Sequence, residues 1–221
     1  MAMNRALFAK QLEPGLNALF GMEYKQYPQQ WKSMVHTKEI NAANILNRGF
    51  NSSYTGGDGV EMLSTAHPTS NGNQSNELAT AADFTETSLE QILINISNMD
   101  DDRGIPIAAM GQCLIIPTAL AFDAERVLNS NLRSATAEND INANRSMGML
   151  PDGVKVVQRL TDTDAWFVKT DVPDGMKMFQ RRAMKKGMEG DFETGNIRYK
   201  CSERYSFGWT DWRGIYGSPG A

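Results

Sequence analysis

Histidine and cysteine, the side chains that most often bind metals or act as nucleophiles, are scarce in this sequence. The 221 residues contain two histidines and two cysteines. Cys113 and Cys201 lie far apart without a Cys-x-x-Cys spacing, so we expect two free, reduced thiols. The HExxH, GxSxG and nucleotide-binding glycine motifs are also missing. The sequence therefore predicts a protein that is not an enzyme, with no catalytic residue, no cofactor-binding residue and no metal ligand.

Long hydrophobic runs are missing as well. The most apolar stretch, residues 105–122, is interrupted by Pro106, Gly111 and Pro117, which would leave unpaired polar groups in a membrane. No apolar run follows the first ten residues, so we expect no secretory signal. Hydrophobic residues make up 41% of the chain and charged residues 22%. This composition predicts a soluble, folded protein that is made in the cytoplasm and has no membrane partner.

The charges are unevenly distributed along the chain. The net charge of −4 excludes a protein that is basic as a whole. Residues 33–176 nevertheless carry nineteen acidic and nine basic side chains, whereas residues 177–221 carry five acidic and nine basic ones. Such segregation indicates either contacts between oppositely charged surfaces of two copies or simply separate solvated surfaces.

The N-terminal residues predict an arm. Residues 4–12 and 16–24 have the apolar spacing of two short helices, and residues 26–31 are typical of an extended segment. Elements this short bury little surface among themselves. The segment 1–32 therefore either lies on another part of an assembly or forms the first hairpin of the core.

Three longer helices are predicted from apolar residues at three- and four-residue spacing. They span residues 33–48, 88–99 and 117–128. Ser33 is the expected N-cap of the first helix, and Phe122 is expected to face inward from the third. Residues 129–149 form a polar, asparagine-rich segment that predicts a long surface loop.

The remaining apolar runs predict strands, most of them in the C-terminal half. They cover residues 105–116, 155–160, 166–169, 176–186 and 197–209. The second and third of these runs are expected to form a hairpin. In the last run, apolar residues alternate with basic and polar ones, and Glu203 is the exception on the apolar face. The fold class predicted is α+β, with mainly antiparallel strands.

Several aspartates could carry chemistry but are better explained as turn residues. The pairs Asp162/Asp164 and Asp171/Asp174 could act as acid and base, and the three aspartates at 100–102 could bind Ca²⁺. Aspartate is common in turns because its side chain bonds to nearby backbone amides, and the ligand spacing of a calcium loop is missing. We therefore favour turns.

The two histidines and the glycine-rich residues 56–59 also favour structural roles. Neither His36 nor His67 has a carboxylate or cysteine partner at a motif spacing. No lysine lies near residues 56–59 and no helix is predicted after them, so a turn is favoured over a phosphate-binding loop.

Basic and aromatic residues interleave between Arg181 and Trp212, which raises nucleic-acid binding as an alternative function. Alternate residues of a strand point to opposite faces, however, so aromatic and basic side chains would not meet the same nucleotide. We expect the aromatic face to be core and the basic face to meet a partner's acidic surface or a packaged polyanion.

Two segments of the chain resemble the major capsid proteins of tailed bacteriophages. They are residues 51–60 (NSSYTGGDGV) with 63–68 (LSTAHP), and residues 203–217 (ERYSFGWTDWRGIYG). The resemblance covers nearly the whole chain and implies the Hong Kong 97 type capsid fold, with an N-terminal arm, a spine helix, a peripheral domain and an axial domain. By position, it implies an arm at 1–32, a peripheral domain with the end of the spine helix at 33–77 and 175–221, and an axial domain at 78–174.

The sequence departs from this family at one point. The resemblance implies a long extended loop and the first part of the spine helix between the arm and residue 33, but Trp31 and Lys32 run directly into Ser33. We infer that a segment is missing between Lys32 and Ser33. If the chain is continuous there, the contact of that loop with a neighbouring subunit is in doubt.

The resemblance implies a structural protein that self-assembles into hexameric and pentameric capsomers of an icosahedral phage head enclosing double-stranded DNA. Its partners would be copies of itself, portal, scaffolding or decoration proteins, and the packaged DNA by non-specific contact. It would be made in the host cytoplasm and reside in the virion. An encapsulin-like compartment shell protein is the alternative with the same fold. The residues expected to contribute to interfaces are Leu7, Phe8, Leu16, Phe20, Arg181, Arg182, Lys185 and Lys186.

Overall fold

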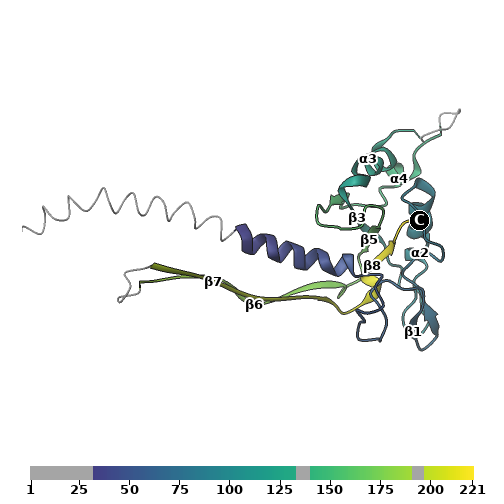
Figure 1. Ribbon diagram of the computed structural model, residues 1–221. Coiled ribbons are helices and arrows are strands. Elements are labelled where there is room, and N and C mark those ends of the chain that lie inside the picture. The colour runs from purple at the N-terminus through teal and green to yellow at the C-terminus, as the bar shows by residue number, and fades with distance from the viewer. Residues whose placement is uncertain (1–31, 133–139, 191–196) are drawn as a thin grey trace, which may run out of the picture. The chain divides into compact units, whose positions relative to one another are not determined.

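Helices and strands both contribute to the fold, as predicted (Figure 1). The computed structural model describes residues 32–132, 140–190 and 197–221. The chain divides into two units, Met1–Ile40 with Gln180–Tyr205, and Asn41–Phe179 with Ser206–Ala221. We call the first the ribbon unit and the second the body. The α+β class is confirmed.

A helix spans residues 32–47 and passes from the ribbon unit into the body (Figure 1, dark blue). The hydroxyl of Thr37 donates to the carbonyl oxygen of Ser33 at 3.0 Å, so Ser33 lies inside the helix. Its prediction as the N-cap is wrong, because the helix already includes Lys32. Lys32 and Ser33 are consecutive residues of one helix, which gives no support to a missing segment at this point.

A four-stranded sheet forms the centre of the body. Its order is β4 (Val154–Val156), β3 (Gly111–Ile116), β5 (Trp166–Thr170) and β8 (Ile215–Ser218). β3 pairs parallel with β4 and antiparallel with β5, which in turn pairs antiparallel with β8. The predicted hairpin of residues 155–160 and 166–169 is therefore wrong. Because β3 is buried along almost its whole length, it takes the position between these two strands.

The strand predicted at residues 105–116 is also shorter than expected. β3 begins only at Gly111. Ala108 has a φ of 51°, in the left-handed region, and a strand cannot pass through this conformation. The apolar composition of residues 105–110 therefore gave a false strand signal.

Alternate residues of the sheet enter two separate core clusters. The first cluster packs one face of the sheet against α2 and includes Leu114, Ile116, Trp166, Val168 and Tyr216. The second packs the other face against residues near the end of the helix 32–47 and includes Leu46, Leu63, Ile115, Phe167 and Ile215. The sheet is thus covered on both faces, which explains why β3, β5 and β8 are buried along almost their whole length.

The helix α2 (Glu86–Ser97) lies within two residues of the predicted helix 88–99. Thr85 is its N-cap, and the side chains of Thr85 and Ser88 each accept a hydrogen bond from the other's backbone N–H. The apolar stripe predicted from the spacing is buried and consists of Leu89, Ile92, Leu93 and Ile96.

The third predicted helix is α3 (Ala121–Asn129), preceded by the 3-10 turn η1 (Thr118–Leu120). Phe122 is 77% exposed, so the prediction that it faces inward is wrong. Ala124 is the residue of α3 that is buried, and two residues along a helix correspond to nearly opposite sides. A further helix, α4 (Ala143–Met147), lies in the segment that was predicted to be loop.

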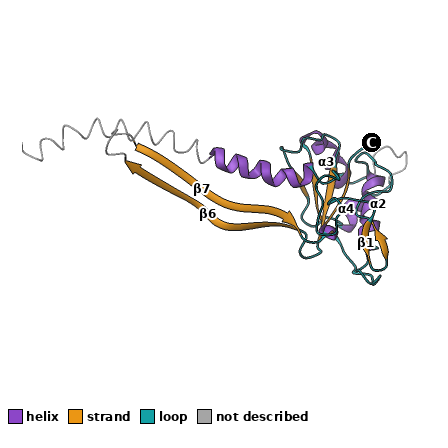
Figure 2. Ribbon diagram, turned by 60° about the horizontal axis from the view of Figure 1, so that its bottom comes forward, coloured by secondary structure: helices purple, strands orange, loops and turns teal. Residues whose placement is uncertain are grey.

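The two long C-terminal strands, β6 (Met176–Gly190) and β7 (Ile197–Trp209), form a two-stranded sheet (Figure 2, orange). The bounds predicted for β7 are confirmed. Trp209 packs against the second core cluster, as expected for the aromatic face, but Tyr205 and Phe207 are only half-buried. The strands β1 (His67–Thr69) and β2 (Gly72–Gln74) form a separate short hairpin.

Candidate functional site

The predicted interface residues fall in two places. Leu7, Phe8, Leu16 and Phe20 lie outside the described residues. Arg181, Arg182, Lys185 and Lys186 lie on β6, and all four are exposed. The structure therefore presents the basic half of the predicted set to solvent in the single chain, while its role in assembly stays a prediction.

One face of the ribbon unit is basic. The guanidinium of Arg182 donates to the hydroxyl of Ser202 at 3.0 Å, so the even-numbered residues of β6 and β7 share a face. We call this the basic face, and its exposed cations are Arg182, Lys186, Lys200 and Arg204. The four cations give this face a positive charge.

The opposite face of the ribbon unit carries Glu203, the exception in the alternating pattern. Its side chain is 3% exposed, and its Oε1 accepts a hydrogen bond from Lys38 Nζ at 2.5 Å. The same ammonium group lies 5.2 Å from the centre of the Tyr205 ring. Lys38 thus explains the acidic residue on the apolar face: a cation on the helix 32–47 pairs with it. The partners are 165 residues apart, so no local pattern could have predicted the pair.

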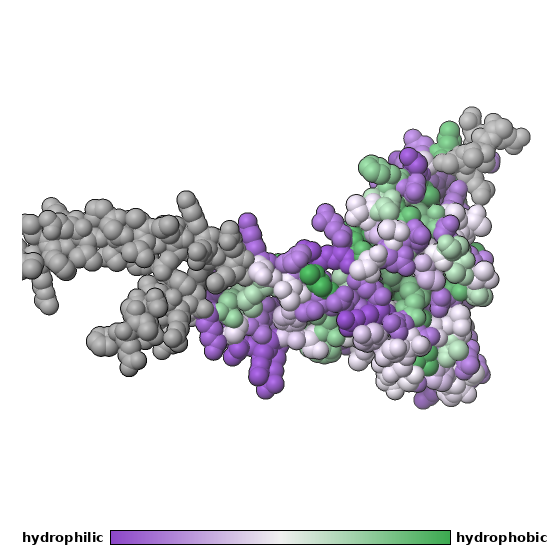
Figure 3. Space-filling view, in the orientation of Figure 1, coloured by the Kyte–Doolittle hydropathy of each residue, from purple (hydrophilic) through white to green (hydrophobic). Residues whose placement is uncertain are grey.

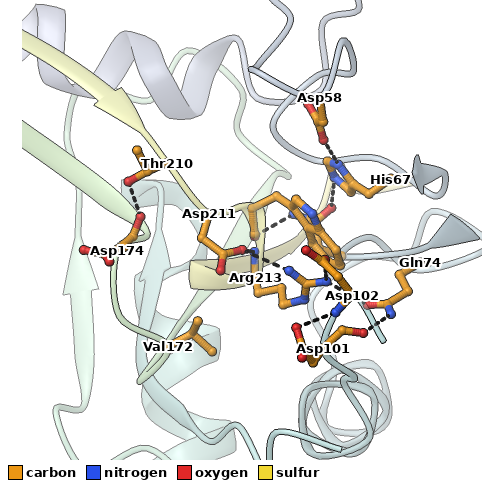
Figure 4. A network of polar contacts seen from close by, with 12 residues as sticks. Asp58, His67, Gln74, Asp101, Asp102, Val172, Asp174, Thr210, Asp211 and Arg213 are labelled. Carbon is orange, nitrogen blue, oxygen red and sulfur yellow. Dashed lines mark hydrogen bonds and ion pairs between the residues drawn. The ribbon is translucent and has the colours of Figure 1, made fainter. Parts of the chain in front are cut away.

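In the body, Arg213 is the centre of a buried polar network (Figure 4). Its Nε donates to the carbonyl oxygen of Asp100 at 2.9 Å, and a terminal nitrogen donates to Asp102 Oδ1 at 2.7 Å. Its guanidinium stacks over the Trp212 ring at 4.3 Å. Three aspartates after the C-terminal end of a helix oppose the helix dipole, and Arg213 supplies the compensating positive charge. The solvated turn expected at 100–102 is therefore tied to the C-terminal segment.

His67 is fixed on the other side of Trp212. Its ring is fully buried and stacks on the indole with a centroid distance of 4.4 Å. Nδ1 lies 2.7 Å from Asp58 Oδ2, and Nε2 lies 3.0 Å from Asn76 Oδ1. Sequence reasoning missed both partners, because each lies nine residues from His67 without a known motif. The only sequence signal was Asp58 itself, within the glycine-rich turn 56–59.

The orientation of the Asn76 amide is set by three backbone carbonyl groups. Its Nδ2 donates to the carbonyl oxygens of Met62, Trp212 and Ile215 at 2.8 to 3.1 Å. Its Oδ1 therefore faces His67, and an acceptor lies opposite each ring nitrogen. A buried ring held from two sides has no room for a substrate, so this arrangement is structural.

Three carboxylates line a cavity of about 290 Å³ next to this network, those of Asp101, Asp171 and Asp211. Each already accepts a hydrogen bond from a backbone N–H, at 2.6 to 2.9 Å. Asp162 likewise accepts from the backbone N–H of Asp164 at 3.0 Å. Asp162 therefore serves a turn, as predicted, whereas the carboxylate of Asp171 joins two distant segments, since Met110 lies 61 residues away. Among the described residues, no three His, Cys, Asp or Glu side chains, these three carboxylates included, are placed so that they could hold a metal ion together.

The thiol of Cys113 is a poor nucleophile in this structure. It is 1% exposed on β3. Burial raises the pKa of the Cys113 thiol, and nearby Asp152 adds to this rise while Lys155 and Lys169 oppose it. Since the thiolate is the reactive form, the raised pKa favours the inert thiol. In the described parts of the chain, no helix is both long enough and apolar enough to cross a membrane.

Comparisons with known proteins agree with the resemblance seen in the sequence. A family model described as phage capsid protein matches residues 32–218. No curated protein matches the chain. Among solved structures, the chain is similar to a virus-like particle from Pyrococcus furiosus, with 12% identity, a TM-score of 0.40, and 64% of this chain and 55% of that chain covered.

A structure of Mycobacterium phage Che8 is similar to the same extent, with 15% identity, a TM-score of 0.39, and 64% of this chain and 52% of that chain covered. The chain thus spans about half the length of both structures. The weight of the comparison rests on the family model, which extends over most of the chain.

Proposed function

The chain belongs to the phage capsid protein family, and from this premise we propose that its copies self-assemble into hexameric and pentameric capsomers of an icosahedral head that encloses double-stranded DNA. In this proposal the chain has a structural role and carries out no enzymatic step. It is made in the host cytoplasm and resides in the virion. Its partners are copies of itself, the portal, scaffolding or decoration proteins of the same head, and the packaged DNA through non-specific contacts.

The main observation in support of the proposal is the basic face of the ribbon unit. Its side chains are exposed and belong to a two-stranded sheet, which is marginally stable by itself in water. Residues 33–176 carry ten more acidic than basic side chains, so a neighbouring copy offers an extended anionic surface. Attraction between these surfaces would both orient copies and stabilise the ribbon, and many modest contacts of this kind add up in a closed shell.

The domain assignment follows from the same proposal. Residues 1–32 serve as the arm, residues 33–77 with 175–221 as the peripheral domain with the end of the spine helix, and residues 78–174 as the axial domain. The interface contributors then come from the arm and from β6. This division is tested by the contacts between copies, since each part should meet a different neighbour.

Electron microscopy of the purified chain over a concentration series, with the mass measured in parallel by light scattering, tests the proposal. Closed shells or rings of five and six copies are the expected result. A chain that stays monomeric at every concentration and ionic strength would overturn it. The content of the particles separates the two shell functions: nuclease-protected double-stranded DNA supports a phage head, and protein cargo supports an encapsulin-like compartment.

The basic face also favours a second candidate function, the binding of nucleic acid by the free subunit. Contact of its four cations with phosphates predicts that log affinity falls against log salt with a slope of about −3 to −4. Fluorescence anisotropy with a labelled DNA duplex measures this slope. Salt-dependent DNA binding by a chain that never forms particles would favour nucleic-acid binding over the capsid function.

A further inference from the structure

An apolar cavity of about 320 Å³ lies between α2 and α4 in the body. Its walls are mainly hydrophobic, and the apolar side chains that line it are Leu93, Ile94, Ala143, Met147 and Met149. Ile94 and Met147 are exposed at its rim although both are large hydrophobic residues. Figure 3 shows apolar surface (green) among polar residues over the part of the molecule that holds α3 and α4. Water covers such surface poorly, so an apolar occupant would stabilise it.

The cavity also contains a buried amide without a partner. Asn144 lines the cavity and is 6% exposed, and its Nδ2 has no hydrogen-bond partner among the described residues. A buried N–H donor that stays unpaired costs about 1 to 3 kcal/mol relative to a paired one. The occupant that fits is therefore apolar with a weak acceptor, such as the π face of an aromatic ring.

The wall that carries Asn144 is fixed before any occupant arrives. Asn142 caps α4: its Oδ1 accepts from the backbone N–H of Arg145 at 3.3 Å. Its Nδ2 donates to the carbonyl oxygen of Val127 on α3 at 2.6 Å. The cavity is thus preformed, which lowers the entropic cost of filling it.

The same body carries a side chain that matches this cavity. Phe122 on α3 is the most exposed of the large hydrophobic residues described, at 77%. It does not line the cavity, so a single chain cannot fill its own cavity without rearranging. Arg126, four residues later on the same side of α3, pairs with Asp123 of its own helix at 2.8 Å but is 73% exposed in its side chain, and Glu90 lies at the cavity. The surface around Phe122 and the cavity are complementary in hydrophobicity, and Arg126 and Glu90 offer one pair of opposite charges between them.

We propose that the cavity between α2 and α4 is a socket for the Phe122 ring of a second copy of this chain. This inference rests on the proposed function and specifies one of its contacts. A cavity of about 150 Å³ suffices to hold benzene, so the socket accommodates a phenyl ring. The ring packs against Ile94 and Met147 and presents its π face to the Asn144 amide, while Arg126 approaches Glu90. Because ring and socket are different surfaces, the contact is heterologous, and a rotation of about 60° or 72° between successive copies would close it into the rings of six or five that the proposed function requires.

Cysteine cross-linking between differently tagged copies tests the contact. In a Cys201→Ser background, one copy carries Phe122→Cys and the other Met147→Cys, and the mixed particles are mildly oxidised. We expect a disulfide-linked pair of the two tagged copies, with the 122–147 link identified by mass spectrometry. Ile105→Cys, which replaces another exposed hydrophobic residue of the body, is the matched control and should give no link to position 147.

The second measurement is the protein concentration at which each variant assembles. Phe122→Ser should raise the concentration needed for assembly by about tenfold or more, because it removes a phenyl group that would otherwise be buried. Phe122→Leu, which keeps an apolar side chain, should have a smaller effect, and Ile105→Ser should have none. The unfolding midpoint of the free chain should be the same in all variants, since both residues are exposed.

The outcomes separate the two proposals. Particles that form normally without a 122–147 link, or a Phe122→Ser variant that assembles like the wild type, would overturn the socket and leave the capsid function intact. If the wild-type chain itself forms no particle or ring under any condition, the proposed function fails and the socket fails with it.

Discussion

The body and the ribbon unit differ in how far their charged and polar groups are buried. In the body, His67, Asn76 and Arg213 are buried, and each makes hydrogen bonds to other parts of the same chain. On the ribbon unit, the cations of the basic face are exposed, and one buried carboxylate, Glu203, pairs with a single lysine. The body therefore satisfies its buried polar groups within the chain, whereas the ribbon unit exposes most of its charges to solvent.

The largest effect should come from breaking the polar network of the body. Asn76→Ala removes the donor for three buried carbonyl groups and the acceptor for His67, so we expect the free energy of unfolding to fall by about 3 kcal/mol. Urea unfolding of the free chain, followed by tryptophan fluorescence, measures this loss. Asn73→Ala, at an exposed position of β2, is the control and should change the stability by less than about 0.5 kcal/mol. Equal effects of the two variants would show that the network is dispensable.

The reactivities of the two cysteines allow a direct comparison of the body with the ribbon unit. Cys113 is buried in the sheet and its pKa is raised by burial, whereas Cys201 is half-buried on β7. A thiol with a raised pKa has less thiolate at pH 8, so Cys113 should react at least about a hundredfold more slowly than Cys201 with a thiol reagent. Mass spectrometry of single-cysteine variants gives both rates, and in urea they should become equal. A fast-reacting Cys113 in the native chain would contradict the packing of β3.

The pair of Lys38 and Glu203 tests how the ribbon unit is held together. Lys38→Met leaves the buried carboxylate without its cation, and we expect a local loss of about 2 kcal/mol, since Lys38 is partly exposed. Hydrogen exchange of residues 200–205 should therefore become faster, while exchange of β3 and β5 in the body stays the same.

The double variant Lys38→Met with Glu203→Leu provides the control for this pair. Replacing both charges by apolar groups should restore exchange to within about 1 kcal/mol of the wild type. If the single variant already exchanges like the wild type, the pair contributes nothing to the ribbon unit and the contrast with the body is lost.

The smallest effect on folding is expected from the basic face. Arg182→Glu with Arg204→Glu changes exposed residues, so the unfolding free energy should change by less than about 0.5 kcal/mol. Assembly should be impaired most strongly at low salt, where attraction between charged surfaces is least screened. Light scattering at two salt concentrations measures this. Assembly as efficient as that of the wild type would rule out the basic face as an interface.

The elements with a strong local pattern could be predicted from the sequence. The spacing of Leu89, Ile92 and Ile96 gave α2 to within two residues, and strict alternation gave the bounds of β7. Both signals are properties of adjacent residues and do not depend on the rest of the chain. The turn role of Asp162 followed for the same reason, whereas the hydrogen bond from Met110 to Asp171 joins residues 61 apart.

The features that depend on distant residues could not be predicted. The parallel pairing of β3 with β4 and the contact of Arg213 with Asp102 join segments that no local pattern connects. Phe122 was placed wrongly because a short helix has two candidate apolar sides, and packing of the small Ala124 decides between them. Of the candidate sites, the basic face was visible in the charge pattern, whereas the cavity between α2 and α4 depends on a helix that the sequence did not reveal.

The position of β8 has a consequence for when the body can fold during synthesis. β8 is an edge of the central sheet, and Trp212 and Arg213, just before it, close the polar network. The central sheet is complete only when residues 215–218 pair with β5, so the body can reach its final fold only after this segment has been translated. A chain that terminates early would leave the apolar strand β5 unpaired on one side.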